Sequence, residues 1–230
     1  MSLPVAILAG GLATRLHPIT ETIPKSLVDV AGKPFVVHQL ALLRAAGIER
    51  VVLCLGHLGE QVEALLGDGN AHGMAVAYSY DGGRPLGTGG ALRRALPQLG
   101  DRFFVLYGDS YLRCNYGDIE RAFVESCKLG LMTVYENDGE HDSSNVSFVD
   151  GRIVRYEKGC PGMTHIDYGL GALRAEAVAV YPAGERFDLE VVYQTLLAHD
   201  ELVGYEVHER FYEIGSPRGL ADTRALLERA

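Results

Sequence analysis

The sequence predicts an α/β protein with a mostly parallel central sheet that helices cover on both faces. Apolar segments of strand length alternate with helix-like segments in the first half of the chain, and three of these strands run into glycine-rich or acidic turns. Hydrophobic residues make up 47% of the chain and charged residues 22%, which is typical of a globular protein with a sizeable core. A parallel sheet with buried faces is the simplest fold that accounts for these observations.

The elements of the first half alternate in type. We expect strands over residues 3–9, 50–55, 74–80 and 103–107, and helices over residues 34–46, 58–66 and 89–96. Gly47 is expected to close the first helix, as a residue just past a helix end often does. Pro97 is expected to stop the third helix, because proline has no backbone N–H to donate.

The second half is less regular. We expect strands over residues 131–136, 144–149, 152–156 and 166–174, then a helix over 189–199 and a strand over 202–207. Asp150-Gly151 is a hairpin signal between two of these strands. A last helix should begin at Ser216-Pro217, because serine is a good N-cap and proline suits the first helical position. We expect one domain over residues 1–230, with halves of about 1–112 and 113–230.

The charge balance and the apolar segments exclude several classes of protein. Lys and Arg total 21 against 30 Asp and Glu, a net charge of −9, which works against binding to long nucleic acids. No apolar run approaches the length of a membrane span, and the N-terminus has no basic segment typical of a signal peptide. We therefore expect neither nucleic acid nor membrane as a partner.

Four scattered cysteines bear on metal binding and on the cellular compartment. They are Cys54, Cys114, Cys127 and Cys160, and no two of them form a CxxC pair. This spacing argues against a zinc site or a disulfide framework and favours a reducing, cytoplasmic environment.

Three turns at the ends of predicted strands are the main functional clue. Gly10-Gly11 follows the first strand, residues 81–90 (DGGRPLGTGG) follow the third, and Gly108-Asp109 follows the fourth. In open α/β sheets, ligands bind beyond the carboxyl ends of the strands. The sequence therefore predicts a ligand site at this edge of the sheet.

The first of these loops has features of a phosphate site. Its spacing is neither that of the Rossmann dinucleotide motif nor that of the P-loop. Gly10 and Gly11 would let backbone N–H groups approach an anion closely. Arg15 can hold two phosphate oxygens with its planar fork, and Lys25, fixed behind Pro24, supplies a point charge.

Five segments together resemble the sugar-1-phosphate nucleotidyltransferases, also called nucleotide-sugar pyrophosphorylases. These segments are LAGGLATRLHPITETIPKSLVDVAGKPFV, PLGTGGALRRAL, LYGDSYL, RYEKG and FYEIGSPRGL, and they span nearly the whole chain. IDYGLGALR and FYEIGSP are most similar to the short heptose- or mannose-1-phosphate guanylyltransferase-like members. The resemblance implies a three-layer, Rossmann-like nucleotidyltransferase fold without the β-helix of longer members. Its first half would bind the nucleotide, and its mixed-strand second half the sugar phosphate.

The resemblance also implies a reaction, a cofactor and substrates. A sugar 1-phosphate oxygen attacks the α-phosphorus of a nucleoside triphosphate and pyrophosphate leaves, with Mg²⁺ as the cofactor. By this resemblance Arg15 holds the leaving phosphates, and Lys25 neutralises the α-phosphate and the sugar phosphate. Asp109 and Glu213 are the implied metal ligands.

Further site residues follow from the same resemblance. The implied nucleotide contacts are Leu8, Ala9, Gly10, Gly11, Asp81, Gly87 and Thr88, and the implied sugar-phosphate contacts are Asn145, Lys158, Tyr168, Gly169 and Glu190. Asp81 favours GTP, because a carboxylate can accept hydrogen bonds from both N–H donors of guanine but is repelled by the carbonyl oxygens of uracil.

Two residues depart from the family pattern, and alternative functions stay open. Ala13 stands where the family has glycine, at a cost of about 1 kcal/mol if that position needs a positive φ. Glu213 stands where the family has aspartate. The alternatives are a uridylyl- or thymidylyl-transferring member, an enzyme making CDP-alcohols, a glycosyltransferase, and a catalytically silent regulatory subunit. The sugar and the oligomeric state, including a homo-oligomer, are left open.

Overall fold

The computed structural model describes residues 2–137, 139–157 and 159–229. The strands are β1 Val5–Leu8, β2 Asp29–Val30, β3 Lys33–Pro34, β4 Arg50–Leu55, β5 Ala75–Tyr80, β6 Arg102–Tyr107, β7 Ser110–Tyr111, β8 Gly130–Glu136, β9 Val146–Val149, β10 Arg152–Tyr156, β11 His165–Arg174, β12 Leu202–Glu206 and β13 Tyr212–Glu213. The helices are α1 Phe35–Ala45, α2 Gly59–Leu66, α3 Gly87–Leu99, α4 Tyr116–Ser126, α5 Ala175–Ala179, α6 Leu189–Ala198 and α7 Pro217–Leu227. Short 3₁₀ turns lie at Thr14–Leu16, Ile19–Glu21, Lys25–Leu27 and Asn70–His72.

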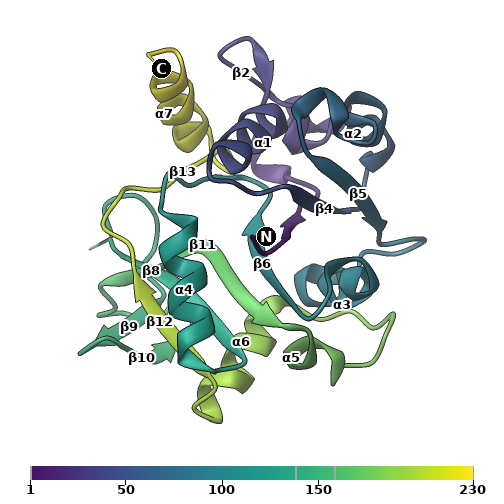
Figure 1. The fold of residues 1–230 in the computed structure, drawn as a ribbon. Coiled ribbons are helices and arrows are strands. Elements are labelled where there is room, and N and C mark those ends of the chain that lie inside the picture. The colour runs from purple at the N-terminus through teal and green to yellow at the C-terminus, as the bar shows by residue number, and fades with distance from the viewer. Residues whose placement is uncertain (1, 138, 158, 230) are drawn as a thin grey trace.

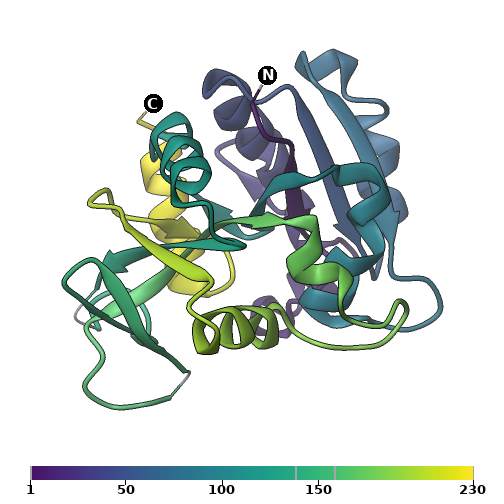
Figure 2. The same cartoon turned by 60° about the horizontal axis from the view of Figure 1, so that its bottom comes forward.

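A nine-stranded mixed sheet joins the two halves of the described chain. Its order is β10-β9-β11-β6-β1-β4-β5, with β8 paired to β11 and β12 paired to β8. Strands β6, β1, β4 and β5 are parallel, whereas β11 runs antiparallel to both β6 and β8. The strands β9 and β10 therefore lie at one end of the molecule and β5 at the other, as Figures 1 and 2 show. The predicted parallel half and mixed half share one continuous sheet.

Helices cover both faces of this sheet and create two cores. Alternate residues of β1 point to opposite faces, so that Val5 and Ile7 belong to one core and Ala6 to the other. Buried side chains of α1, α2 and α4 complete the first core, and those of α3, α5 and α6 complete the second. The predicted three-layer α/β fold is confirmed, and within the described residues there is no β-helix.

Most of the predicted elements are present, with boundaries shifted by one or two residues. Asp150 and Gly151 both have positive φ, at 50° and 76°, and join the antiparallel strands β9 and β10 as a hairpin. The Ser216 hydroxyl caps α7 by accepting a hydrogen bond from the Gly219 N–H at 3.0 Å. Both turn signals were therefore interpreted correctly.

The prediction that Pro97 stops the third helix is wrong. Helix α3 runs through Pro97 to Leu99 and ends before Gly100, which has a φ of 78°. Pro97 lies in the last turn, where a missing N–H costs one hydrogen bond and the fixed φ of proline is still helical. The buried Leu99 side chain stabilises this extra turn by packing into the second core.

The sequence analysis missed helix α4. Asn115 caps this helix by accepting a hydrogen bond from the Asp118 N–H at 3.2 Å, and Tyr116, Ile119 and Phe123 form its buried face. Their spacing of three and four residues is the helical signal that could have revealed it. No helix among the described residues is long and apolar enough to cross a membrane.

Candidate active site

A cavity of about 1120 Å³ lies where the carboxyl ends of β1, β5 and β6 face β11 and the start of α6. The following predicted site residues line it: Leu8, Ala9, Gly10, Gly11, Arg15, Lys25, Asp81, Gly87, Thr88, Asp109, Asn145, Tyr168, Gly169, Glu190 and Glu213. Lys158, the remaining one, lies outside the described residues. The structure thus brings residues from both halves of the chain to one cavity.

Gly108 allows two strand ends to meet at the floor of this cavity. A Cβ atom at Gly108 would lie 2.6 Å from the Leu8 carbonyl oxygen and 2.9 Å from the Ala9 Cα atom. Any larger residue would therefore push the end of β6 away from the end of β1. The close approach places Asp109 directly beside the glycine-rich loop that follows β1.

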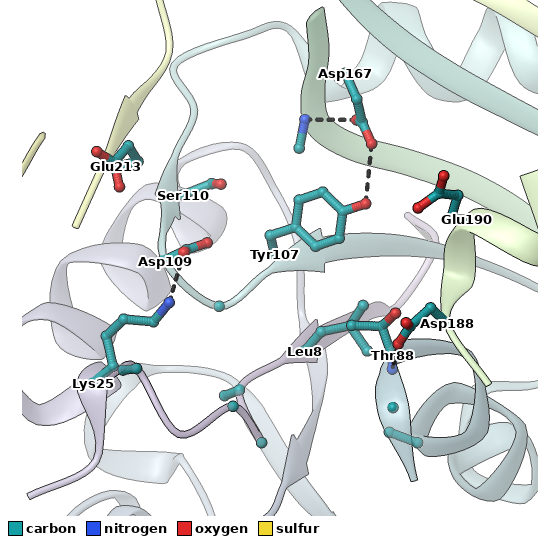
Figure 3. Close-up of a pocket in the computed structure, with 18 of the residues that line it drawn as sticks. Leu8, Lys25, Thr88, Tyr107, Asp109, Ser110, Asp167, Asp188, Glu190 and Glu213 are labelled. Atoms are coloured by element: carbon teal, nitrogen blue, oxygen red, sulfur yellow. Dashed lines mark hydrogen bonds and ion pairs between the residues drawn. The ribbon is translucent and has the colours of Figure 1, made fainter. Parts of the chain in front are cut away.

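Asp109 is paired with Lys25. The Lys25 Nζ atom donates to Asp109 Oδ2 at 2.6 Å, and the two side chains are 21% and 24% exposed. Figure 3 shows this pair at one end of the cavity. Gln39, which the sequence analysis did not single out, holds the backbone nearby, since its buried side chain donates to the Ser110 carbonyl oxygen at 2.8 Å.

Glu213 and Arg15 reach the same end of the cavity. Strand β13 pairs with β7, which sets Glu213 opposite Ser110. The Glu213 carboxylate accepts hydrogen bonds from the N–H groups of Gly215 and Ser216 at the start of α7. A Cβ atom at Gly215 would lie 2.7 Å from Asp109 Oδ2, 3.0 Å from Glu213 Oε2 and 3.2 Å from an Arg15 guanidinium nitrogen. These three charged groups therefore meet around Gly215.

The carboxylate oxygens of Asp109 and Glu213 near Gly215 are ligands of the kind that Mg²⁺ binds. Mg²⁺ takes hard oxygen ligands and is usually held by one or two carboxylates together with phosphate oxygens and water. Asp109 and Glu213 supply two carboxylates, and over residues 2–137, 139–157 and 159–229 no group of three His, Cys, Asp or Glu side chains is placed to hold a metal. The two carboxylates fit a Mg²⁺ ion that also binds substrate phosphates.

Ala13, the departure from the family pattern in the first loop, has a left-handed backbone, with φ 49° and ψ 41°. We expect Ala13→Gly to raise the free energy of unfolding by about 1 kcal/mol, because glycine avoids the strain of a Cβ atom in this conformation. Urea unfolding measures the change. Ala46→Gly is the matched control, since Ala46 has a φ of −79° and should lose stability on the same substitution. A less stable Ala13→Gly protein would contradict this account.

Asp81 lies in the loop between β5 and α3, against the glycine-rich loop. Its side chain is nearly buried, and its Oδ2 atom accepts a hydrogen bond from the Leu86 N–H at 3.1 Å. Burial raises the pKa of the Asp81 carboxyl, while the Leu86 N–H and Arg94 oppose that shift. A carboxylate held in this way faces a cavity large enough for a nucleotide.

The second half contributes a carboxylate that the sequence analysis missed. Asp167 of β11 lines the cavity, and its Oδ2 atom accepts a hydrogen bond from the Tyr107 hydroxyl at 3.0 Å. Its Oδ1 atom accepts from the Gly169 N–H at 3.0 Å, and its own N–H donates to Asn145 at 2.9 Å. The motif IDYG contained this residue, but a strand pattern alone did not show which face would meet the cavity.

Two further residues lie at the N-terminal end of α6. Asp188, also missed, accepts a weak hydrogen bond from the Thr88 N–H at 3.4 Å, and the Thr88 hydroxyl accepts from the Leu189 N–H at 2.8 Å. Glu190 lies in the first turn of α6, where it accepts from Gln194 at 3.3 Å. Thr88 therefore links the loop of the first half to the helix of the second.

Tyr168 borders the cavity but belongs mainly to the core. Its side chain is 1% exposed and packs against Tyr135 and Phe211. Its hydroxyl is buried and has no hydrogen-bond partner among the described residues. This geometry favours a packing role over the sugar contact that the resemblance implied.

Comparisons with known proteins agree with the fold and with the family that the sequence resembles. The sequence model of the family described as Nucleotidyl transferase matches residues 5–145. The N-acetylmuramate alpha-1-phosphate uridylyltransferase of Neisseria meningitidis serogroup B is 32% identical over 227 residues, which are 96% of each chain. The low-salt glycan biosynthesis nucleotidyltransferase Agl11 of Haloferax volcanii is 41% identical over an alignment of 235 residues, which covers 96% of this chain and 65% of that protein.

A solved structure extends this similarity to three dimensions. The crystal structure of HddC from Yersinia pseudotuberculosis complexed with GMP-PN has a TM-score of 0.82 and 27% sequence identity, covering 98% of this chain and 99% of that one. The family match covers more than half of the chain, and the Neisseria relative aligns over nearly all of it. The chain belongs to the nucleotidyl transferase family, as one of its sugar-1-phosphate nucleotidyltransferases.

Proposed function

We propose that this enzyme transfers a guanylyl group from GTP to a sugar 1-phosphate and releases pyrophosphate. One observation carries the proposal: Arg15, Lys25, Asp109 and Glu213 meet at one end of a cavity whose other end is lined by the second half of the chain. Two anionic substrates must be brought together in line for this reaction, so positioning and charge neutralisation account for most of the catalysis.

The cations and carboxylates divide the work at the phosphate end. Lys25 neutralises the α-phosphate and the incoming sugar phosphate, and Arg15 holds the β- and γ-phosphates that leave. Asp109 and Glu213 hold Mg²⁺, which when bound supplies positive charge to the phosphate oxygens. Arg15 has no ion pair across the part of the chain that the structure describes, so it is available to bind phosphates without first losing a partner.

The preference for guanine rests on Asp81. A carboxylate can accept from both the N1–H and the N2–H₂ groups of guanine, whereas uracil offers a single donor between two carbonyl oxygens. The guanine nucleotide analogue in the HddC structure supports the same preference. Uridylyl transfer is the second candidate, because the Neisseria relative bears the name of a uridylyltransferase.

Pyrophosphate release over a matrix of nucleoside triphosphates and sugar 1-phosphates tests this proposal. We expect Mg²⁺-dependent turnover, with a kcat/KM for GTP at least about 10-fold above those for UTP and dTTP, which corresponds to about 1.4 kcal/mol of discrimination. The acceptors include heptose, mannose, glucose and N-acetylmuramate 1-phosphates. A higher kcat/KM for UTP would overturn the guanine assignment, and absence of turnover with every pair would overturn the reaction itself.

A further inference from the structure

Gln39 is a polar residue on the buried face of α1. Phe35, Val36, Leu40 and Leu43 form the rest of that face and pack into the apolar cores, whereas Gln39 lies among them with an exposed fraction of 1%. A carboxamide in such a place is costly unless hydrogen bonds replace those that it loses to water. The hydrogen-bond partners of Gln39 therefore indicate its role.

Both partners of Gln39 are carbonyl oxygens of the turn that carries Asp109. The Gln39 Nε2 atom donates to the Ser110 carbonyl oxygen at 2.8 Å and, over a longer distance of 3.4 Å, to the Tyr107 carbonyl oxygen. Tyr107 ends β6 and Ser110 begins β7, so these residues flank Gly108 and Asp109. Since carbonyl oxygens only accept hydrogen bonds, the NH₂ group of the carboxamide must face them. One side chain of α1 thus holds both sides of the turn.

Two other elements hold the remaining backbone groups of this turn. The Gly108 N–H donates to the Leu8 carbonyl oxygen at 3.0 Å, and the Ile214 N–H donates to the Asp109 carbonyl oxygen at 2.9 Å. Leu8 ends β1, and the fully buried Ile214 directly follows β13. The backbone of residues 107–110 is therefore fixed by α1, by β1 and by the segment after β13, and this fixes the direction in which the Asp109 side chain leaves the backbone.

The position of the turn decides which groups the Asp109 carboxylate reaches. Its Oδ2 atom lies 2.6 Å from Lys25 Nζ and 2.7 Å from the point that a Cβ atom of Gly215 would occupy. Glu213 Oε2 lies 3.0 Å from the same point. Mg²⁺ demands near-ideal octahedral geometry with short bonds to oxygen, so a shift of about 0.5 Å in one carboxylate weakens its binding.

We propose that Gln39 is a positioning residue, which holds Asp109 where this carboxylate can bind the metal ion together with Glu213. The inference rests on the proposed function, in which these two carboxylates hold Mg²⁺. Gln39 itself does not line the cavity, so it acts through Asp109. Residues that orient metal ligands through hydrogen bonds typically contribute about 10- to 100-fold to metal affinity or activity. A glutamine that only filled space in the core would contribute nothing to either.

Gln39→Met tests the inference, because it nearly keeps the length of the side chain and removes both N–H donors. We expect this variant to bind Mn²⁺ without nucleotide about 10-fold more weakly than the unmodified protein, as measured by titration calorimetry. The Mg²⁺ concentration at half-maximal turnover should rise by about the same factor. The KM for the sugar 1-phosphate should stay unchanged, because the second half of the chain keeps its contacts.

Gln98→Met is the matched control. The Gln98 Nε2 atom also donates to a strand carbonyl oxygen, that of Tyr78 at 3.0 Å, but both residues lie outside the cavity lining. This variant loses the same kind of hydrogen bond, so it should lower the midpoint of a thermal melt and leave Mn²⁺ affinity unchanged. A merely structural role for Gln39 predicts the same result for Gln39→Met.

Gln39→Glu is the conservative variant. Burial raises the pKa of a glutamate at this position, and the protonated carboxyl can donate one hydrogen bond to the Ser110 carbonyl oxygen. The Mn²⁺ affinity of Gln39→Glu should therefore lie between those of the unmodified protein and Gln39→Met. If Gln39→Met unfolds in a thermal melt, Gln39→Glu takes its place in the comparison with the unmodified protein.

The outcomes separate this inference from the proposed function. Unchanged Mn²⁺ affinity and unchanged Mg²⁺ dependence in a folded Gln39 variant would overturn the inference and leave nucleotidyl transfer standing. An equal loss of Mn²⁺ affinity in Gln98→Met would also overturn it, because general destabilisation would then explain the effect. Absence of both Mn²⁺ binding and pyrophosphate release in the unmodified protein would overturn the proposed function, and the inference with it.

Discussion

Asp109→Asn is expected to lower kcat by at least about 100-fold, the usual cost of removing one group that stabilises transition-state charge. Asparagine keeps the size of the side chain and an oxygen that can accept from Lys25, but it removes the negative charge that binds Mg²⁺. The pair with Lys25 is about three-quarters buried, so the remaining asparagine oxygen must keep accepting from the ammonium, and a thermal melt checks that the variant stays folded. Pyrophosphate release measured over a titration of Mg²⁺ checks the prediction.

The turnover of the enzyme after metal removal is the level with which this variant is compared. EDTA should abolish turnover by the unmodified enzyme, and added Mg²⁺ should restore it. Asp109→Asn at saturating Mg²⁺ should approach the turnover of the EDTA-treated enzyme, whereas Asp101→Asn, an exposed substitution outside the cavity lining, should stay at the unmodified level. Near-normal, Mg²⁺-dependent turnover by Asp109→Asn would show that Asp109 does not hold the metal.

The fold was predictable from the sequence where local patterns decide it. The apolar run at β1 and the alternation of strands and helices predict a parallel sheet, and both cores form around it as expected. The first half was therefore predicted nearly completely. Pro97 misled the prediction because the cost of proline depends on its place in the helix, and only the finished helix shows that it lies in the last turn.

The residues that line the cavity were predictable where a motif fixes both the residue and its place at a strand end. Gly10, Gly11 and Asp109 follow β1 and β6, and parallel neighbours in a sheet must end at the same edge. Asp167 could not be found in this way. It lies within β11, whose facing residues are set by pairing with β6 and β8, and these contacts are distant in the sequence.

The second large effect on turnover is expected from removing the charge of Lys25, the ion-pair partner of Asp109. Lys25→Met is expected to lower kcat by about 100- to 1000-fold, because methionine nearly matches the length of lysine but leaves the phosphates without their point charge. Stopped or continuous pyrophosphate assays at saturating substrates measure this loss. Lys25→Arg keeps the charge but not the compact ammonium, so it should retain more activity than Lys25→Met.

The same substitution should change metal binding in the opposite direction. The Lys25 ammonium lies 2.6 Å from Asp109 Oδ2, so a metal ion must displace it before reaching that carboxylate. Methionine removes this competitor, and Lys25→Met should therefore bind Mn²⁺ without nucleotide at least about 10-fold more tightly than the unmodified protein.

Lys33→Met, an exposed substitution on β3 outside the cavity lining, should leave Mn²⁺ affinity unchanged. Equal Mn²⁺ affinity for Lys25→Met and Lys33→Met, measured by titration calorimetry, would mean that Lys25 and the metal do not share Asp109. Tighter Mn²⁺ binding combined with lost turnover would instead assign Lys25 two successive partners, the Asp109 carboxylate before the nucleotide arrives and the substrate phosphates afterwards.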